Sequence, residues 1–261
     1  MCIHFLLVHI FGSVRYQKTN SDYYIYMIIE GLVCAIGVVL ASGGIGEIST
    51  YSIIFGVIFG LTVVGQLWLN LKALAIGPFS YTTVIVSLAT LIAAVSGLFF
   101  GESIDLFQYF GMGVMVLCIV FSTDKNNGSR KSSLKWLVIA LVSCLTNGFV
   151  GIMQKIHQNT EYKAQSTAFL VSAFAFMTVV SALLWLYERK KSGESKFNPN
   201  AKQIAFALLS GATFAVPHTA NLYLAGAMPS AVFWRCSARS FLRSFRWASM
   251  LGRSSIGPGF G

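Results

Sequence analysis

The sequence predicts an all-α membrane protein whose helices cross the bilayer several times. Of its 261 residues, 55% are hydrophobic and only 11% are charged, and the mean hydropathy is +0.68. A soluble domain carries about 25% charged residues, so this class is excluded. The apolar runs are each close to the roughly 20 residues that a helix needs to cross the hydrocarbon core. A repeated break pattern further predicts two related halves.

The first half, residues 1–122, is expected to form a repeat of five helices, of which the first is short. The glycine-rich residues 43–46 predict a tight turn. Gly56 and Gly60, four residues apart on one helix, predict a close contact with a neighbouring helix, because a missing side chain lets two backbones approach. The expected helices lie at residues 1–16, 23–41, 51–74, 80–100 and 106–122.

The second half follows a polar linker at residues 123–133 and is expected to be incomplete. Residues 134–233 form this second repeat, and only three of its helices are visible. They lie at residues 134–153, 164–187 and 203–225, with a basic loop at 188–202. A ninth helix is expected from residue 230 but does not follow, because residues 234–261 form a tail rich in Arg and Ser.

The evidence for a repeat is a helix end followed by a proline, which breaks a helix because it lacks an N–H and has a fixed φ. A shift of 151 residues brings Asn70 onto Asn221 and Pro78 onto Pro229. Self-similarity at a fixed shift is typical of internal repeats. We therefore expect Asn70 and Asn221 to occupy equivalent places in the two halves.

Two stretches carry a family resemblance: NLKALAIGPFSY at residues 70–81 and FFGESIDLFQYFGMGVMVLCIVF at residues 99–121. The chain resembles EamA-type members of the drug/metabolite transporter superfamily over about residues 23–233. Gly101-Glu102, followed by Gln108 and Gly111, is the most specific part. The resemblance implies ten helices in two inverted five-helix repeats, with a central cavity for a small metabolite. It also implies that the last two helices are missing here.

The tail from residue 234 departs from this plan. Arg235, Arg239, Arg243 and Arg246 would lie inside the expected ninth span, where each charge costs about 2.5–3.5 kcal/mol. The simplest interpretation is a frameshift or truncation; the alternative is an amphipathic helix on the bilayer surface. Without a ninth and tenth helix, we expect the polar face of the helix at 203–225, including His218, to lack partners. The 261-residue chain is then expected to be poorly stable and not to transport.

The candidate site residues are polar or aromatic side chains at membrane depth, where polar groups are costly unless partnered or hydrated. Glu30 is either a proton or substrate carboxylate, or a carboxyl group that lies near the headgroups or is paired with a neighbour. For the amides and the histidine, helix packing and substrate contact are equally good interpretations, and the two aromatic residues are cavity walls or interfacial anchors. The candidates are Glu30, Gln66, Trp68, Asn70, Tyr81, Asn147, His218 and Asn221.

Three functions remain open from the residues. The family resemblance implies transport of a small metabolite through a cavity between the repeats, by a protein of the plasma or inner membrane. Active transport would need a coupling ion, because the sequence has no ATP-binding loop. The alternative is a non-transporting fragment or partner subunit, and an oligomer is possible in either case. An enzyme is disfavoured because no His, Asp and Ser set converges. No cofactor, metal site or disulfide is expected, because the five cysteines have no paired spacing.

The net charge of +10 does not indicate nucleic acid, because the basic residues outside the tail lie in loops between apolar runs. Twelve Lys and Arg lie on one side of the expected helices and two on the other. By the positive-inside rule, the linker at 123–133 is cytoplasmic and its partner is the anionic face of the bilayer. The family resemblance, with a cytoplasmic N-terminus, implies the opposite.

The charge distribution makes a testable prediction about orientation. A reporter fused after Lys131 should report the cytoplasm, and one fused after Gly44 should report the outside, because basic loops are retained on the cytoplasmic side. Reporter activity in intact cells checks both. If the fusion after Lys131 reports the outside, the orientation implied by the family resemblance is the right one.

Overall fold

The computed structural model describes residues 20–77, 79–101, 134–192 and 201–227, together with six single residues between 106 and 117. The expected first helix, the linker at 123–133, most of the helix at 106–122 and the tail from residue 234 lie outside the described residues. Every regular element within the described part is a helix, so the all-α class is confirmed there.

The helices match the predicted runs closely and most extend by a few residues. Five of them are long and apolar enough to cross a membrane, the run from Tyr81 to Phe100 being counted as one. The elements are α2 (Asn20–Ser42), α3 (Thr50–Ile76), α4 (Phe79–Ser87), α5 (Ala89–Val95), η1 (Ser96–Phe100), α7 (Leu134–Gln158), η2 (Glu161–Gln165), α8 (Ser166–Ser192) and α9 (Ala201–Ala227).

Helix α9 was predicted as a further span and is not among those five, although it has 27 residues. Its sequence includes Pro217, His218 and Asn221, which lower its mean hydropathy. The helix nevertheless continues through Pro217.

The run at residues 80–100 was predicted as one helix, and the structure divides it. Helix α4 ends at Ser87, α5 begins at Ala89, and the final turn is a 3₁₀-helix. The Ser87 hydroxyl bonds to the carbonyls of Thr83 (2.6 Å) and Val84 (3.1 Å), and so competes with the backbone ladder beside the break at Leu88. Gly101 ends the run with a φ of 73°, which favours glycine.

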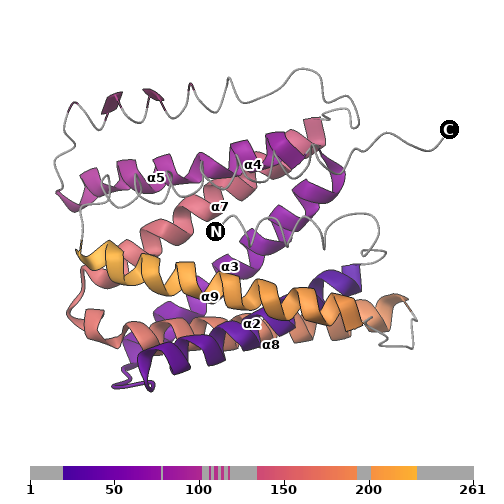
Figure 1. Cartoon of the computed structure of the whole chain (residues 1–261), viewed down its shortest axis with the longest axis horizontal. Helices are drawn as coiled ribbons and strands as arrows, with labels where there is room; N and C mark the ends of the chain where they lie inside the picture. The colour runs from indigo at the N-terminus through magenta and orange to yellow at the C-terminus, as the bar shows by residue number, and fades with distance from the viewer. Residues whose placement is uncertain are drawn as a thin grey trace.

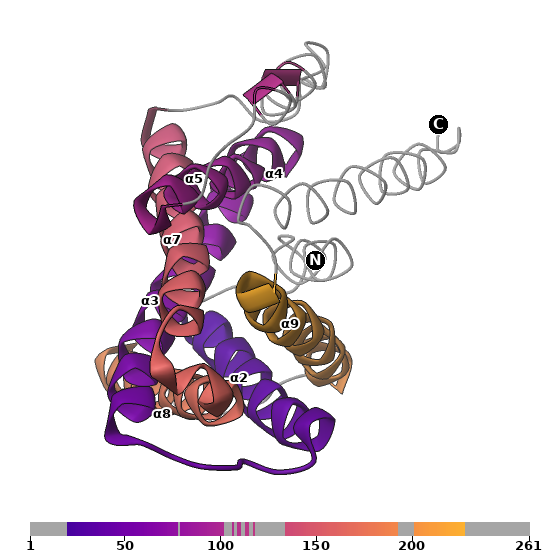
Figure 2. The same cartoon turned by 90° about the vertical axis from the view of Figure 1, so that its left-hand side faces the viewer.

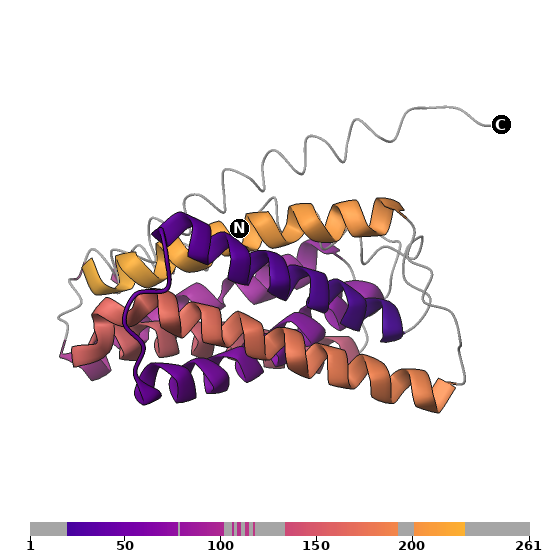
Figure 3. The ribbon, with the colours of Figure 1, turned by 90° about the horizontal axis from the view of Figure 1, so that it is seen from below.

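The helices form two groups joined by α3 and α7. Helices α4 and α5 lie at one end of the molecule, α2, α8 and α9 lie at the other, and α3 and α7 run diagonally between them (Figure 1). Viewed from the side, α9 lies against α2 and across from α3 (Figure 2). Seen from below, α2 and α8 run alongside each other in opposite directions (Figure 3). Helix α8 packs against both α2 and α3.

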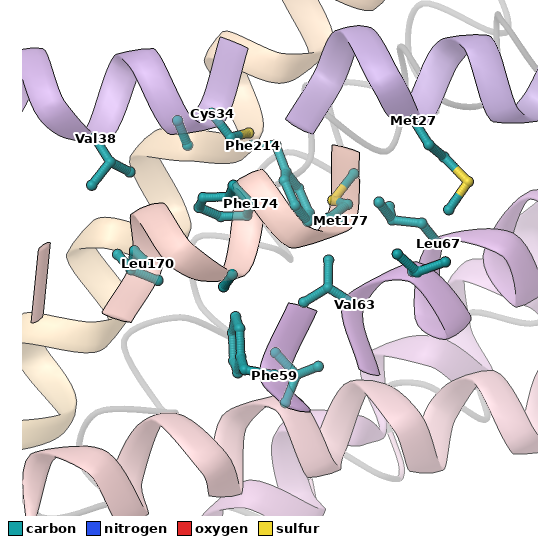
Figure 4. Packing of buried hydrophobic residues seen from close by; sticks show 14 of the residues in the cluster. Met27, Cys34, Val38, Phe59, Val63, Leu67, Leu170, Phe174, Met177 and Phe214 are labelled. Carbon is teal, nitrogen blue, oxygen red and sulfur yellow. The ribbon is translucent and has the colours of Figure 1, made fainter. Parts of the chain in front are cut away.

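The main core lies where α2, α3, α8 and α9 meet. Phe59 and Val63 of α3, Phe174 and Met177 of α8 and Phe214 of α9 point into this common space (Figure 4). Phe174 lies at the centre and is completely buried. The rings of Phe174 and Phe214 are 6.2 Å apart in an edge-to-face arrangement, a favourable geometry for aromatic pairs.

The outer surface of these helices is apolar, the reverse of a soluble bundle. Many large aliphatic side chains are more than a third exposed, while the interior holds buried Gln, Asn, Glu and His. Lipid chains can cover such a surface, whereas water would make it an aggregation hazard. Examples of these outward-facing residues are Leu32, Ile36, Leu40, Ile54, Ile58, Leu61, Leu141, Leu145, Leu183 and Leu186.

The predicted close contact at Gly56 and Gly60 is confirmed. A Cβ on Gly56 would lie 2.0 Å from Ser172 Oγ, and one on Gly60 would lie 2.4 Å from the carbonyl oxygen of Ala173. Both neighbours belong to α8, so the pair sets the distance between α3 and α8. The predicted turn is also found, since Gly43, Gly44 and Gly46 all have positive φ.

The glycine contact can be tested with a matched pair of substitutions on α3. Gly60→Ala should lower the folded yield in membranes, because backbone must move to admit the methyl group, at a cost of about 1–3 kcal/mol. Gly65→Ala should not, because a Cβ there meets nothing within 4 Å. Detergent-resistant folded protein, measured by fluorescence-detected gel filtration, checks both. Equal yields would show that α3 and α8 are not held this closely.

Candidate functional site

A polar cluster lies between α3 and α7. Gln66 and Asn70, which the sequence placed on one face of α3, both meet α7. Gln66 Nε2 donates to Asn147 Oδ1, and Ser143 Oγ donates to Asn70 Oδ1. Asn147 Nδ2 also reaches Asn70 Oδ1 at 3.5 Å and donates to the Ser143 carbonyl at 2.9 Å. We call Gln66, Asn70, Ser143 and Asn147 the α3–α7 polar cluster.

The cluster is enclosed, and one of its acceptors is unused. Gln66, Asn70 and Ser143 are buried, and Asn147 is half-buried. Gln66 Oε1 is buried and has no hydrogen-bond partner among the described residues. Leaving such a group unsatisfied costs about 1–3 kcal/mol, so it is a place where a further donor would bind favourably. Sequence reasoning missed Ser143, which lies four residues before Asn147 and hence on the same face of α7.

A second polar group joins α2 and α9. Glu30 is completely buried, and its Oε1 accepts a hydrogen bond of 3.0 Å from Ser210 Oγ. The hydroxyls of Tyr26 and Ser210 are also bonded to each other. One turn further along α2, Cys34 Sγ donates to the carbonyl of Gly211 at 3.3 Å. We call Tyr26, Glu30 and Ser210 the α2–α9 triad. It places Glu30 inside the protein and pairs it with neighbouring hydroxyl groups.

A third contact joins α7 and α9 and corrects an expectation about His218. This histidine was expected to lack partners on the face of α9, yet it is buried and its Nδ1 lies 3.3 Å from Gln154 Nε2. Three aromatic rings surround it, the closest being Phe214 at 4.2 Å between centroids. Lys155 Nζ also donates to the carbonyl of Ala225 at 2.9 Å. The partner helix is α7, which supplies Gln154 and Lys155 from two adjacent positions.

The remaining sequence candidates lie apart from these groups. Trp68 is half-buried, and Lys72 Nζ lies 3.8 Å from the centre of its ring, a cation–π contact that suits an interfacial anchor. Tyr81 packs edge-on against Trp136 of α7, with 6.5 Å between ring centres. Asn221 is half-buried, in contrast to its predicted counterpart Asn70. The structure thus joins three of the eight candidates into one cluster.

A buried histidine that sequence reasoning missed lies near the end of α7. His157 is completely buried, and neither ring nitrogen has a hydrogen-bond partner among the described residues. Its ring stacks on Phe169 at 4.4 Å and lies beside Tyr51 and Phe55. The sequence did not single it out, because it lies near the basic Lys155 at the end of an apolar run.

No group of His, Cys, Asp and Glu in the described part of the chain could hold a metal ion. The groups described above supply hydrogen bonding by amides, hydroxyls and histidine, together with the buried carboxyl group of Glu30. Comparison with models of known protein families finds no match for this chain, and comparison with curated proteins finds none. The fold defines the class: an all-helical protein with several helices able to cross a membrane.

The different surroundings of Asn70 and Asn221 predict different effects on stability. Asn70→Leu should lower the folded yield more than Asn221→Leu, because it leaves Ser143 and Asn147 without their shared acceptor. Interhelical hydrogen bonds of this kind are worth about 0.6 kcal/mol each and at most about 1.7. Thermal unfolding in detergent checks the order, and an equal loss at both positions would contradict it.

Proposed function

We propose that this chain is a membrane transport protein for a small polar solute, which contacts the α3–α7 polar cluster. The observation that carries the proposal is the buried and unused acceptor Gln66 Oε1, set among the amide and hydroxyl groups of Asn70, Ser143 and Asn147. Polar groups this far from helix ends are costly in a bilayer and mark solute pathways more often than lipid contacts.

The chemistry of the cluster indicates the class of solute. Its members are neutral and supply both donors and acceptors. Binding by neutral amides and hydroxyls suits a solute with hydroxyl or amide groups better than a multiply charged ion. A donor from the solute would satisfy Gln66 Oε1, and rearrangement of the Asn70 and Asn147 amides would supply further bonds.

Two further features support a transporter. The described helices are apolar outside and enclose several buried polar side chains, as expected of a bundle with a solute path through it. The resemblance of residues 70–81 and 99–121 to EamA-type transporters points the same way. The sequence has no nucleotide-binding loop, so transport against a gradient would draw on an ion gradient.

A second function, a non-transporting membrane protein such as a partner subunit, is favoured by the bonding within the same groups. Gln66 with Asn147, Asn70 with Ser143 and Gln154 with His218 are all pairs internal to the chain. Such pairs hold membrane helices together without any solute. The two functions differ in whether the polar cluster ever exchanges its internal partners for a ligand.

Uptake into vesicles tests the proposal. The purified chain is reconstituted in lipid vesicles and offered radiolabelled sugars, amino acids and nucleosides in turn. We expect one class to accumulate faster than in protein-free vesicles. Gln66→Leu should reduce this uptake at least tenfold, because it removes both the donor to Asn147 and the unused acceptor.

The control is Leu145→Ala on the outward face of α7, which should leave uptake unchanged because this side chain is exposed. Incorporation of each variant is measured in the same vesicles by quantitative immunoblotting. If the folded chain incorporates normally and no class of solute enters, the non-transporting function is the right one.

A further inference from the structure

We infer that the α2–α9 triad of Tyr26, Glu30 and Ser210 is a proton-binding site that couples transport to a pH gradient. This inference rests on the proposed transport function for its coupling role, but the binding site itself does not. The Glu30 carboxylate would take a proton from water on one side of the membrane and release it to water on the other. Two observations carry the inference. One is the geometry of the triad, and the other is that the equivalent position between α3 and α8 is filled by apolar residues.

The geometry encloses one carboxyl group between two hydroxyls. All three side chains are at least 99% buried, at the contact between α2 and α9. An ionised carboxylate is expensive to bury without a compensating charge, whereas a protonated one is not. The hydroxyl of Ser210 donates to Glu30 Oε1 and is bonded to the Tyr26 hydroxyl. The site can therefore stabilise either form of the carboxyl group by hydrogen bonds.

The matching place is found by comparing α9 with α3. Both helices have 27 residues, and a shift of 151 brings Thr50–Ile76 onto Ala201–Ala227. This is the same shift that brings Asn70 onto Asn221. It also brings Gly60 onto Gly211, and each of these glycines faces the backbone of another helix.

These two glycine contacts define the correspondence between α2 and α8. A Cβ on Gly60 would lie 2.4 Å from the carbonyl oxygen of Ala173 in α8. One on Gly211 would lie 2.8 Å from Val33 Cβ and 3.2 Å from the carbonyl oxygen of Glu30, both in α2. The contacts are equivalent if Glu30 corresponds to Ala173, a shift of 143. That shift brings Gly31 onto Phe174, and a Cβ on Gly31 would lie 3.2 Å from the Phe174 carbonyl oxygen. The two residues that touch, Gly31 and Phe174, are therefore also the two residues that the shift matches. This is expected of a contact that lies on a pseudo-twofold axis.

The place that matches the triad is apolar. The rings of its two phenylalanines pack 4.9 Å apart, where the triad has hydroxyls in contact. Apolar side chains therefore fill this position in the fold without difficulty, and the polar triad is not required for packing. Its presence in only one of the two places indicates a ligand. The matched positions are Phe169 for Tyr26, Ala173 for Glu30 and Phe59 for Ser210.

The surroundings favour a proton over a sodium ion. Sodium sites in transporters use backbone carbonyls freed by unwound helices, but α2 is helical without interruption from Asn20 to Ser42. Tyr26 and Cys34, both on α2, are titratable groups that interact with Glu30. Helix α9 contributes Ser210 to the triad. Helix α8 places Phe174 and Thr178 against Gly31, the residue after Glu30 in α2. The basic side chains of α8 lie in its last turn.

Infrared spectroscopy tests the site without any solute. In the purified chain, titration with pH should show the carbonyl band of one buried carboxylic acid, which is absent in Glu30→Gln and retained in Glu47→Gln. Glu47 is the matched control because it is exposed in the loop after α2. Ser210→Ala should shift the pH midpoint of this band, which keeps the test decisive if Glu30→Gln folds poorly. An unchanged band in Glu30→Gln overturns the proposal, as does a band that responds to Na⁺ at constant pH.

A second measurement tests the coupling. In vesicles that take up solute, an imposed pH gradient should raise the wild-type rate at least tenfold and leave Glu30→Gln unaffected, while exchange of internal for external solute continues in the variant. If the wild-type rate of uptake is the same with and without the pH gradient, the coupling role is overturned. If no solute is taken up but the Glu30 band titrates, the proposed transport function fails while the proton-binding site is supported.

Discussion

The structure depends on the close approach of α8 to α2 and α3, which small residues permit. Gly56 and Gly60 bring their backbone against α8 at distances that no Cβ could occupy, and Gly31 makes a further close contact with α8. In lipid there is little hydrophobic force between helices, so tight packing of this kind is the main source of association. Helix α8 packs on α2 and α3, while α9 packs on α2 and α7 packs on α3. The α2–α9 triad and the α3–α7 polar cluster lie in the last two contacts.

The polar side chains form separate groups, each between two helices, rather than one continuous network. The α3–α7 cluster is neutral and has an unused acceptor, whereas the α2–α9 triad holds a single carboxyl group between hydroxyls. This separation suits a solute site and an ion site that act on each other through α8, which contacts both α2 and α3. Because α8 contacts both α2 and α3, a movement of α2 and α9 would displace α8 and so change its packing on α3.

The sequence predicted the helices and the Gly56–Gly60 contact because apolar length and small-residue spacing are local properties. It placed Gln66 and Asn70 on one face for the same reason. It could not predict that Asn147 and Ser143 would complete their cluster, since that depends on which helix packs against α3. The burial of Glu30 also follows from tertiary contacts, whereas the break at Leu88 lies beside a local bond of the Ser87 hydroxyl to its own helix. The partner of His218 was missed because α7 was not expected to supply one.

The most direct test of the account is whether water reaches the α3–α7 polar cluster in a working protein. A single cysteine is introduced as Ser143→Cys in a chain whose native cysteines are replaced by serine, and a membrane-impermeant thiol reagent is applied from each side of sealed vesicles. The account predicts labelling from at least one side, slowed by transported solute, and none at a Leu145→Cys control facing lipid. A residue 143 that never reacts from either side would contradict a solute path through this cluster.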